Sequence, residues 1–521
     1  VIVHAYEEWA ERCFVRLNGM FAITIFDEKK NALVLARDRI GMKPLYFWDY
    51  NGTLIWASEI KAILLHREVK PAPDCEAICD FAAFQNSIDE KTFFKGIKKV
   101  LPGHFLKAAA NNTEIKQYWD LEFEDGRNFS DIKDTLVVYE NTFKDAVKRH
   151  LVSDVEIGSC LSGGFDSSSV AFWASKFLDY PVKTFTGFFS GGAKYDERNI
   201  TRTFNGLFNT EAVEIKITPD DFRENIEKVI YHLDEPTLGS GALPQYMVSK
   251  EISKHVKVVL TGHGGDELFA GYQVYKAAFY KDLLRTDLQQ FAGSFWRNRP
   301  DEIWKVLYFS LFPMIFPEVK YGLFNMFDSR QRSRLFTDEF SESVKGYSPS
   351  QNLEEKYLKG RNFSNTERVL YLYLKTYLPT LFIQEDKVGM AHSIESRMPI
   401  CDAEMVGLAA RIPYQFKLYG NELKYLTKTV MKQYFPEKFY NHPKMGFPTP
   451  IAGWFRDELK DFVYDKLISG NDEIGIFRTQ YLKDLLDSHN RWQSDTLYDY
   501  VRANKIYSLL AVQIWFKQFM K

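Results

Sequence analysis

The chain has 521 residues, more than a single hydrophobic core usually organises, so two or three domains are expected. Hydrophobic residues make up 45% and charged residues 26%, which is typical of a soluble globular protein and excludes a disordered chain. With 67 Lys and Arg against 69 Asp and Glu, the balance argues against a general nucleic-acid binder. The five cysteines lack a CxxC spacing and no apolar run is long enough to span a membrane, so we expect a cytoplasmic protein without disulfides or a zinc ribbon.

The first part of the chain is predicted to be one helix followed by β-structure. Residues 1–14 have the spacing of an amphipathic helix. "MFAITIFDEKKNALVLARD", residues 20–38, places two apolar runs around a polar turn, which is typical of a hairpin. Further strands are expected at 52–59 and, as a pair with "NN" at the turn, at 100–123. A polar stretch then favours a linker, and we place a domain boundary near residue 130.

After the boundary, strands alternate with helices. The expected strands are 155–161, 182–189, 212–218 and 256–262, and the expected helices between and before them are 134–151, 167–178, 196–208, 220–233 and 243–256. This alternation predicts an α/β fold with a parallel sheet and right-handed crossovers. Ligands on such sheets bind beyond the carboxyl ends of the strands. Beyond about residue 275 the pattern is mainly helical.

The stretch "CLSGGFDSSSV", residues 160–170, lies where a strand ends and a helix begins. Free backbone N–H groups at a helix start favour an anion, and glycines let the backbone approach phosphate closely. The residues that suit a phosphate are Ser162, Gly163, Gly164, Ser167 and Ser168. Asp166 fits a phosphate site if it holds Mg²⁺. A helix cap in a glycine turn is the alternative, and this stretch alone does not decide between the two readings.

A second stretch, "VVLTGHGGDELFAGY", residues 258–272, is again a strand that ends in glycines and acids. Asp266 is expected at the same edge of the same sheet as Asp166, so the two carboxylates could share one Mg²⁺. Capping of the following helix by the acids is the alternative reading. Two such loops at one sheet edge favour a phosphate site with a shared Mg²⁺ over helix capping.

These motifs carry a resemblance to a known family. "SGGFDSS" resembles the pyrophosphate loop of ATP pyrophosphatases, and "TGHGGDELFAGY", "HSIESRMPICD" and "NHPKMGFPTPIAGWF" resemble segments of glutamine-hydrolysing asparagine synthetases, in that order. "LNGMFAITIFD", "LARDRIGMKPLYF" and "ASEIKAIL" resemble the later half of that family's glutaminase domain. The resemblance covers nearly the whole chain.

The resemblance implies a two-part architecture. Residues 1–130 would be the C-terminal portion of a class II glutamine amidotransferase domain, a sandwich of the N-terminal-nucleophile type. Residues 131–521 would be an asparagine synthetase domain with a parallel sheet of the ATP-pyrophosphatase type and a helical C-terminal part. A homodimer is one assembly consistent with it.

The resemblance also implies a reaction and its site residues. The β-carboxylate of aspartate would attack the α-phosphate of ATP to give β-aspartyl-AMP and pyrophosphate, and ammonia would then displace AMP. The residues expected at ATP are Leu161, Ser162, Gly163, Gly164, Asp166, Ser167, Ser168, Gly187, Thr261 and Gly262. Asp166 and Asp266 match the magnesium ligands, and Lys444 matches a lysine that stabilises charge on the reacting phosphate.

The acceptor site is expected in the segment 386–402. Glu395 and Arg397 lie two residues apart, so they share a face only in an extended segment. They would position the substrate or help the attacking ammonia lose a proton, and a structural ion pair is the alternative. His392 is expected to be structural. His263 is expected to be catalytic, yet it stands where some relatives have an acid that contributes to forming the acyl-adenylate, which leaves the identity of the acceptor open.

The glutaminase nucleophile of the family is an N-terminal cysteine, whereas residue 1 here is valine. The resemblance therefore implies a chain truncated at its N-terminus that uses free ammonia, with glutamine as donor in the intact protein. Cys13 is expected on the apolar side of a helix, at a position that resembles the protein core, and not as a substitute nucleophile. Two other functions stay open: a related adenylating amidotransferase or cyclase that acts on another carboxylate, and a non-catalytic nucleotide-binding module.

Overall fold

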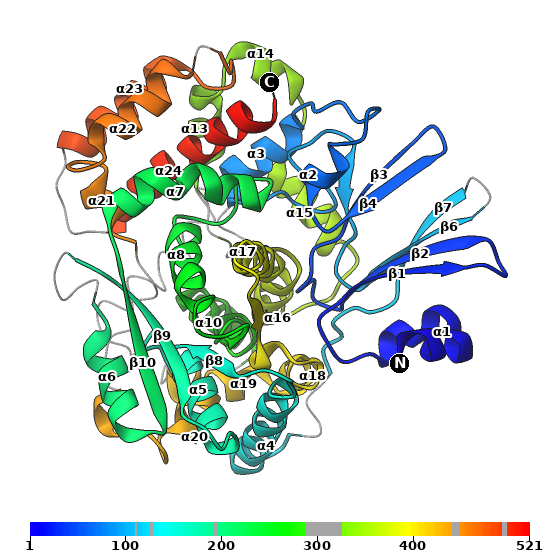
Figure 1. Ribbon diagram of the computed structural model, residues 1–521, viewed down its shortest axis with the longest axis vertical. Coiled ribbons are helices and arrows are strands. Elements are labelled where there is room, and N and C mark those ends of the chain that lie inside the picture. The colour runs from blue at the N-terminus through cyan, green and yellow to red at the C-terminus, as the bar shows by residue number, and fades with distance from the viewer. Residues whose placement is uncertain are drawn as a thin grey trace.

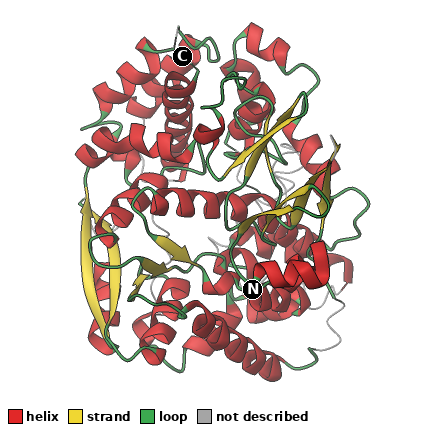
Figure 2. Ribbon diagram, turned by 45° about the vertical axis from the view of Figure 1, so that its right-hand side comes forward, coloured by secondary structure: helices red, strands yellow, loops and turns green. Residues whose placement is uncertain are grey.

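Figure 1 shows the computed structural model of the chain. It describes residues 1–109, 112–124, 129–190, 196–286, 323, 326–439, 449–471, 473–491 and 497–520. Helices predominate, and the strands form separate groups with helices between and around them (Figure 2). Within this described part of the chain, no helix is both long and apolar enough to cross a membrane.

The chain begins with α1 (Ile2–Trp9), so the predicted first helix is confirmed but ends earlier than expected. The segment Ala10–Arg16 continues as a tighter helical turn, and Cys13 within it is fully buried. The predicted hairpin is also confirmed, because β1 (Ala22–Asp27) pairs antiparallel with β2 (Ala32–Arg37).

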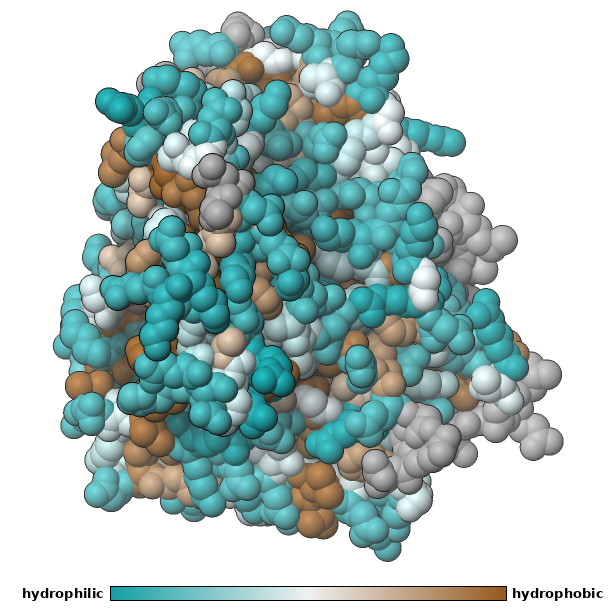
Figure 3. All heavy atoms as spheres, turned by 90° about the vertical axis from the view of Figure 1, so that its right-hand side faces the viewer, coloured by the Kyte–Doolittle hydropathy of each residue, from teal (hydrophilic) through white to brown (hydrophobic). Residues whose placement is uncertain are grey.

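Two antiparallel sheets lie within the first 117 residues. One has the order β1-β2-β6-β7 and the other β4-β3-β5. The remaining elements are β3 (Tyr46–Tyr50), β4 (Thr53–Ala57), α2 (Ile60–Ile63), α3 (Cys75–Phe84), β5 (Ile97–Lys99), β6 (His104–Ala109) and β7 (Asn112–Gln117). Leu35, Phe47 and Leu106 belong to one buried cluster that joins the two sheets. The face of the molecule that lies on the right in Figure 1 is mainly hydrophilic, with hydrophobic residues in small groups (Figure 3).

The predicted parallel sheet is confirmed. Five strands lie in the order β10-β9-β8-β11-β12, and all four neighbouring pairs are parallel. The strands are β8 (Ile157–Cys160), β9 (Val182–Phe189), β10 (Thr210–Ile217), β11 (Val258–Leu260) and β12 (Glu395–Arg397). α4 (Ile132–His150) precedes the first of these strands, and the helices that connect β8 to β11 are α5 (Phe165–Phe177), α6 (Arg198–Leu207), α7 (Pro219–Leu233) and α8 (Ala242–Ile252). β12 was not predicted as a strand of the sheet; it adds the edge strand from a distant part of the sequence.

The rest of the chain is mainly helical, as the sequence pattern indicates. Its helices are α9 (Gly265–Leu268), α10 (Gln273–Thr286), α13 (Ser329–Leu335), α14 (Asp338–Ser343), α15 (Pro349–Tyr357), α16 (Asn365–Leu372), α17 (Leu378–Met390), α18 (Ala403–Arg411), α19 (Tyr414–Lys417), α20 (Tyr425–Met431), α21 (Ile451–Trp454), α22 (Lys460–Tyr464), α23 (Thr479–Arg491) and α24 (Leu497–Phe519). α17 lies near the middle of the molecule and contacts α7, α8 and β12 (Figure 1).

The N-terminal strands and the helical part share a core. The rings of Phe93 and Phe94 meet the edge of Trp515 in α24, with centroid distances of 5.0 and 5.2 Å. Edge-to-face aromatic pairs of this kind add to the free energy of burial. The first part of the chain therefore packs on the C-terminal helix and does not stand apart as an independent unit.

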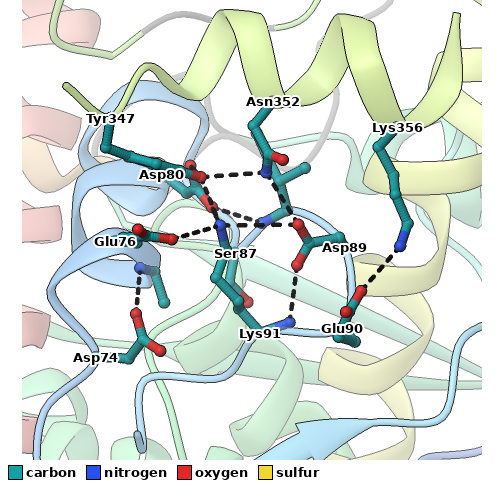
Figure 4. Close-up of polar contacts among 12 residues, drawn as sticks. Asp74, Glu76, Asp80, Ser87, Asp89, Glu90, Lys91, Tyr347, Asn352 and Lys356 are labelled. Atoms are coloured by element: carbon teal, nitrogen blue, oxygen red, sulfur yellow. Dashed lines mark hydrogen bonds and ion pairs between the residues drawn. The ribbon is translucent and has the colours of Figure 1, made fainter. Parts of the chain in front are cut away.

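A polar cluster makes a second connection between these parts (Figure 4). Asp80 of α3 is fully buried and accepts a hydrogen bond of 2.7 Å from the Tyr347 hydroxyl. Lys91 Nζ lies 3.5 Å from the Asp80 carboxylate, and Asn352 of α15 donates to Asp89 at 2.9 Å. The cluster thus joins α3 and the segment that follows it to the start of α15.

Candidate active site

A cavity of about 740 Å³ opens at the carboxyl edge of the parallel sheet. It is lined by the ends of β8 and β9, by the loop after β11, and by side chains of α8, α17 and α24. Strands of a parallel sheet present their carboxyl ends and the following loops at one edge, where ligands bind. The sequence predicted a site at this edge, and the cavity lies there.

The glycine- and serine-rich loop forms one wall. Gly163 has a φ of +81°, a left-handed conformation that suits glycine, and Gly164 precedes the first turn of α5. The Ser162 and Ser167 hydroxyl oxygens lie 3.0 Å apart, and the Ser167 hydroxyl donates to Gly164 O at 3.1 Å. The loop therefore places hydroxyl groups and the start of a 13-residue helix at the cavity, an arrangement that suits an anion.

Asp166 and Asp266 converge on one side chain that the sequence analysis did not predict. Lys424 Nζ contacts the Asp166 carboxylate and lies 2.8 Å from Asp266 Oδ1. Burial alone would lower the pKa of Lys424, but the two carboxylate charges outweigh it and raise the pKa above its ordinary value. The expectation that the two acids meet at one sheet edge is therefore met. A lysine from the start of α20 bridges them.

Glycines make this convergence sterically feasible. A Cβ atom at Gly262 would lie 2.5 Å from the Ser167 backbone nitrogen, so the two loops approach closely only because residue 262 has no side chain. A Cβ at Gly265 would overlap the Asp166 carboxylate, and one at Gly271 would overlap Asp266. The glycines of the second motif thus leave space for the carboxylates of both loops.

The two aspartates fit a magnesium ion. Asp166 Oδ1 is buried and accepts no hydrogen bond from the described residues, so it has a lone pair directed at nothing else. Mg²⁺ prefers one or two carboxylates together with phosphate oxygens. Within the described residues, no group of three His, Cys, Asp or Glu side chains is arranged to hold a metal ion. A metal at this place would therefore need ligands from a bound phosphate.

A second polar wall faces the cavity from α17 and α8. Glu385 is only 4% exposed, and its Oε1 accepts a hydrogen bond of 2.7 Å from the Ser396 hydroxyl. Gln245 donates to the other carboxylate oxygen and in turn accepts from Gln384 Nε2 at 2.7 Å. His263 Nδ1 lies 4.0 Å from Glu385 Oε2. Sequence reasoning missed Glu385, although it directly precedes the segment 386–402 that was singled out.

The cavity gathers most of the predicted residues. Those that line it are Leu161, Ser162, Gly164, Asp166, Ser167, Gly187, Thr261, Gly262, His263 and Asp266. Gly163 and Ser168 are not among the lining residues, and the Ser168 side chain is fully buried in α5.

Three further predicted residues lie elsewhere. Glu395 and Arg397 lie on one face of the extended β12 and pair with each other at 2.7 Å, and neither lines the cavity. This contact corresponds to the structural ion pair weighed as the alternative. His392 packs against the Tyr246 ring at a centroid distance of 4.4 Å, away from the cavity lining. Lys444 lies outside the described residues.

Comparison with known proteins adds a family match to this geometry. A family model described as "Asparagine synthase" matches residues 139–517, and one described as "Glutamine amidotransferase domain" matches residues 1–119. The chain is 28% identical to "Asparagine synthetase [glutamine-hydrolyzing] 1" of Bacillus subtilis, over 99% of this chain and 80% of the relative. It is 26% identical to a "Putative asparagine synthetase [glutamine-hydrolyzing]" of Mycobacterium bovis, over 100% and 79%. It is 27% identical to "Amidase chyE" of Penicillium rubens, over 87% and 73%.

Proposed function

Because the chain belongs to the asparagine synthase family, we propose that it is an ATP-dependent carbon–nitrogen ligase that converts aspartate to asparagine. In this reaction the β-carboxylate of aspartate attacks the α-phosphate of ATP, which forms β-aspartyl-AMP and releases pyrophosphate. Ammonia then displaces AMP and forms the amide. A two-part division of the chain near residue 130, into an amidotransferase portion and a synthetase domain, belongs to the same proposal.

The observation that carries the proposal is the convergence of Asp166, Asp266 and Lys424 beside the Ser162–Ser167 loop. Adenylation concentrates negative charge on the triphosphate and on the departing pyrophosphate. Hydroxyl groups, a helix start and a lysine at one edge of the cavity would stabilise such charge. Positioning the reactants and stabilising this negative charge are the main tasks of an enzyme that transfers AMP from ATP.

Asp166 and Asp266 are the residues that would hold Mg²⁺, which supplies positive charge to the phosphates of ATP when it is bound. Lys424 would then remain beside them as a second positive charge. Its ammonium group offsets part of the negative charge of the two aspartates and would add a positive charge for the phosphates of ATP. By its resemblance to the family's lysine, Lys444 would stabilise charge on the reacting phosphate.

Ammonia is the nitrogen donor that we propose for the 521 residues by themselves. Cys13 is fully buried among Tyr6, Phe14 and Phe105, and burial raises the pKa of its thiol. A buried thiol with a raised pKa is a poor nucleophile. Cys13 is therefore not the nucleophile that a glutaminase would use.

A second candidate keeps the adenylation and changes the acceptor. The relatives include a protein named "Amidase chyE", and position 263, which lines the cavity, is histidine. Wild-type protein should be incubated with ATP, Mg²⁺, ammonia and a panel of carboxylic acids while pyrophosphate is measured. Release with aspartate supports asparagine synthesis, whereas release with another acid alone assigns the second candidate.

The adenylation itself is tested by Asp166→Asn. We expect pyrophosphate release to fall by roughly 100-fold or more, because the substitution removes a carboxylate that would hold Mg²⁺ beside the phosphates. Asp179→Asn, just beyond the other end of α5, is the matched control and should retain wild-type activity. Circular dichroism should show both variants folded, and full activity of Asp166→Asn would refute the assigned role.

A further inference from the structure

The cavity contains two acidic positions of different character. At the first, Asp166 and Asp266 share Lys424, so the negative charge is compensated within the protein. At the second, Glu385 is the acid, and among the described residues the only basic side chain within 4.0 Å of its carboxylate is His263. The two aspartates therefore share one lysine, whereas no lysine or arginine among the described residues lies within 4.0 Å of the acid on the wall formed by α17.

The Glu385 carboxylate is held in a fixed position. Ser396 donates to Oε1 at 2.7 Å and Gln245 donates to Oε2. Gln245 is oriented by Gln384, whose own carbonyl oxygen accepts from the Thr237 hydroxyl at 2.9 Å. Every donor in this chain of contacts is neutral, so the carboxylate is ordered without being neutralised.

The next two residues of α17 form ion pairs with other parts of the chain. Asp386 pairs with Lys43 at 2.6 Å, and Lys387 pairs with the fully buried Asp234 at 2.6 Å. Both contacts join α17 to other parts of the chain, whereas Glu385 lines the cavity. The helix thus holds Glu385 against the cavity by means of ion pairs that do not involve it.

A buried carboxylate without a cationic partner costs free energy, and a ligand with a positive charge recovers it. We propose that Glu385, with Gln245 and His263 beside it, forms an ammonium subsite of the cavity. The inference rests on the proposed function and deepens it, because both substrates other than ATP carry such a group. The ammonium group would be either the α-ammonium of the acceptor amino acid or the ammonium ion that supplies the amide nitrogen.

Glu385→Gln tests the subsite, because it keeps the shape and removes the charge. If the α-ammonium of the acceptor binds here, the KM for aspartate rises roughly 10- to 100-fold, as expected for the loss of a charge-assisted hydrogen bond. The inhibition constant of succinate, which has no amino group, and the KM for ATP stay unchanged. If the ammonium ion binds here, the KM for ammonia rises by a similar factor and that for aspartate does not.

Two further variants keep the result interpretable. Glu385→Asp retains the charge and should recover part of the lost affinity, which a purely structural role would not produce. Glu235→Gln removes another buried carboxylate, one that accepts from Phe93 N and does not line the cavity, and should leave both KM values unchanged. Thermal unfolding of each variant confirms that it is folded.

Failure of the subsite and failure of the proposed function give different results. Unchanged KM values for both aspartate and ammonia in an active Glu385→Gln enzyme would overturn the subsite and leave the proposed function intact. A wild-type protein that releases pyrophosphate with no acid, or forms no amide, would contradict the proposed function before any variant is measured.

Discussion

Among single residues, Lys424 has the most demanding environment at the site. Its ammonium group lies in a buried position between two carboxylates, at the start of α20, and its own backbone has a φ of 56°. A left-handed conformation at a residue other than glycine is uncommon and is maintained only where surrounding contacts require it. The ion pairs with Asp166 and Asp266 are such contacts.

Lys424→Met should lower the free energy of unfolding by about 3–5 kcal/mol, because it removes a buried positive charge that Asp166 and Asp266 share. Urea denaturation in the presence of a chelator measures this change. Lys428→Met is the matched control: its Nζ lies 3.4 Å from the partly exposed Glu422, and the expected change is about 1 kcal/mol or less. Equal changes in the free energy of unfolding for the two variants would contradict the claim that burial makes the ion pairs of Lys424 more important than that of Lys428.

Addition of Mg²⁺ should raise the unfolding temperature of Lys424→Met more than that of the wild type. In the variant Lys424 no longer competes with the ion for the two carboxylates, and a ligand that binds only the folded state stabilises it. Differential scanning calorimetry with and without Mg²⁺ checks this. Asp266→Asn combined with Lys424→Met should remove the difference, and its persistence would place the ion elsewhere.

At the scale of the elements, the site depends on how closely the loop after β11 approaches the first turn of α5. Gly262, Gly265 and Gly271 each leave space that a side chain would fill. The position of the serine-rich loop and of the Asp166 carboxylate therefore depends on how closely the loop after β11 packs against them.

Gly265→Ala should lower the free energy of unfolding by about 1–3 kcal/mol and abolish pyrophosphate release, because the added methyl group displaces the Asp166 carboxylate. Gly407→Ala makes the same change within α18, where nothing lies within 4 Å of the added atom. There we expect a gain of about 0.5–1 kcal/mol and wild-type activity. Equal unfolding free energies and equal activities of the two variants would contradict the predicted overlap between the added methyl group at residue 265 and the Asp166 carboxylate.

At the scale of the whole molecule, the two parts of the chain share both an apolar core and a polar contact. Burial raises the pKa of Asp80 to about 7, while Lys91 and the Tyr347 hydroxyl act in the opposite direction. The folded state therefore retains a proton at Asp80 that the unfolded chain releases at lower pH. This cluster (Figure 4) makes the packing of α3 on α15 sensitive to pH.

The sign of the effect follows from the raised pKa. The contribution of Asp80 to stability is present in full below about pH 4 and is lost as the pH rises to about 7. A difference of one between the pKa values of the folded and unfolded states corresponds to about 1.4 kcal/mol. Asp80→Asn should therefore flatten the fall of the unfolding free energy between pH 5 and pH 8, measured by urea denaturation. The exposed Asp220→Asn should follow the wild-type profile, and parallel profiles for all three proteins would contradict the prediction.

Local patterns were sufficient for much of the fold. The hairpin at residues 20–38, the alternation of strands and helices after residue 131, and the meeting of Asp166 with Asp266 were all predicted, because periodicity and glycine-rich strand ends are local signals. β12 was not predicted as part of the sheet. A three-residue strand has too few residues to show an alternation, and its pairing with β11 is a long-range contact.

The sequence by itself determined which residues form the two glycine-acid loops and the sheet edge at which they meet. Only the tertiary structure decided what completes the site: Lys424 as the bridge between the aspartates, and Glu385 of α17 as the acid beside His263. Neither residue belongs to a motif that marks it, and each lies more than a hundred positions from the loops it contacts. Their roles arise from burial and from the neutral or charged partners around them, which depend on how distant segments pack and not on local sequence.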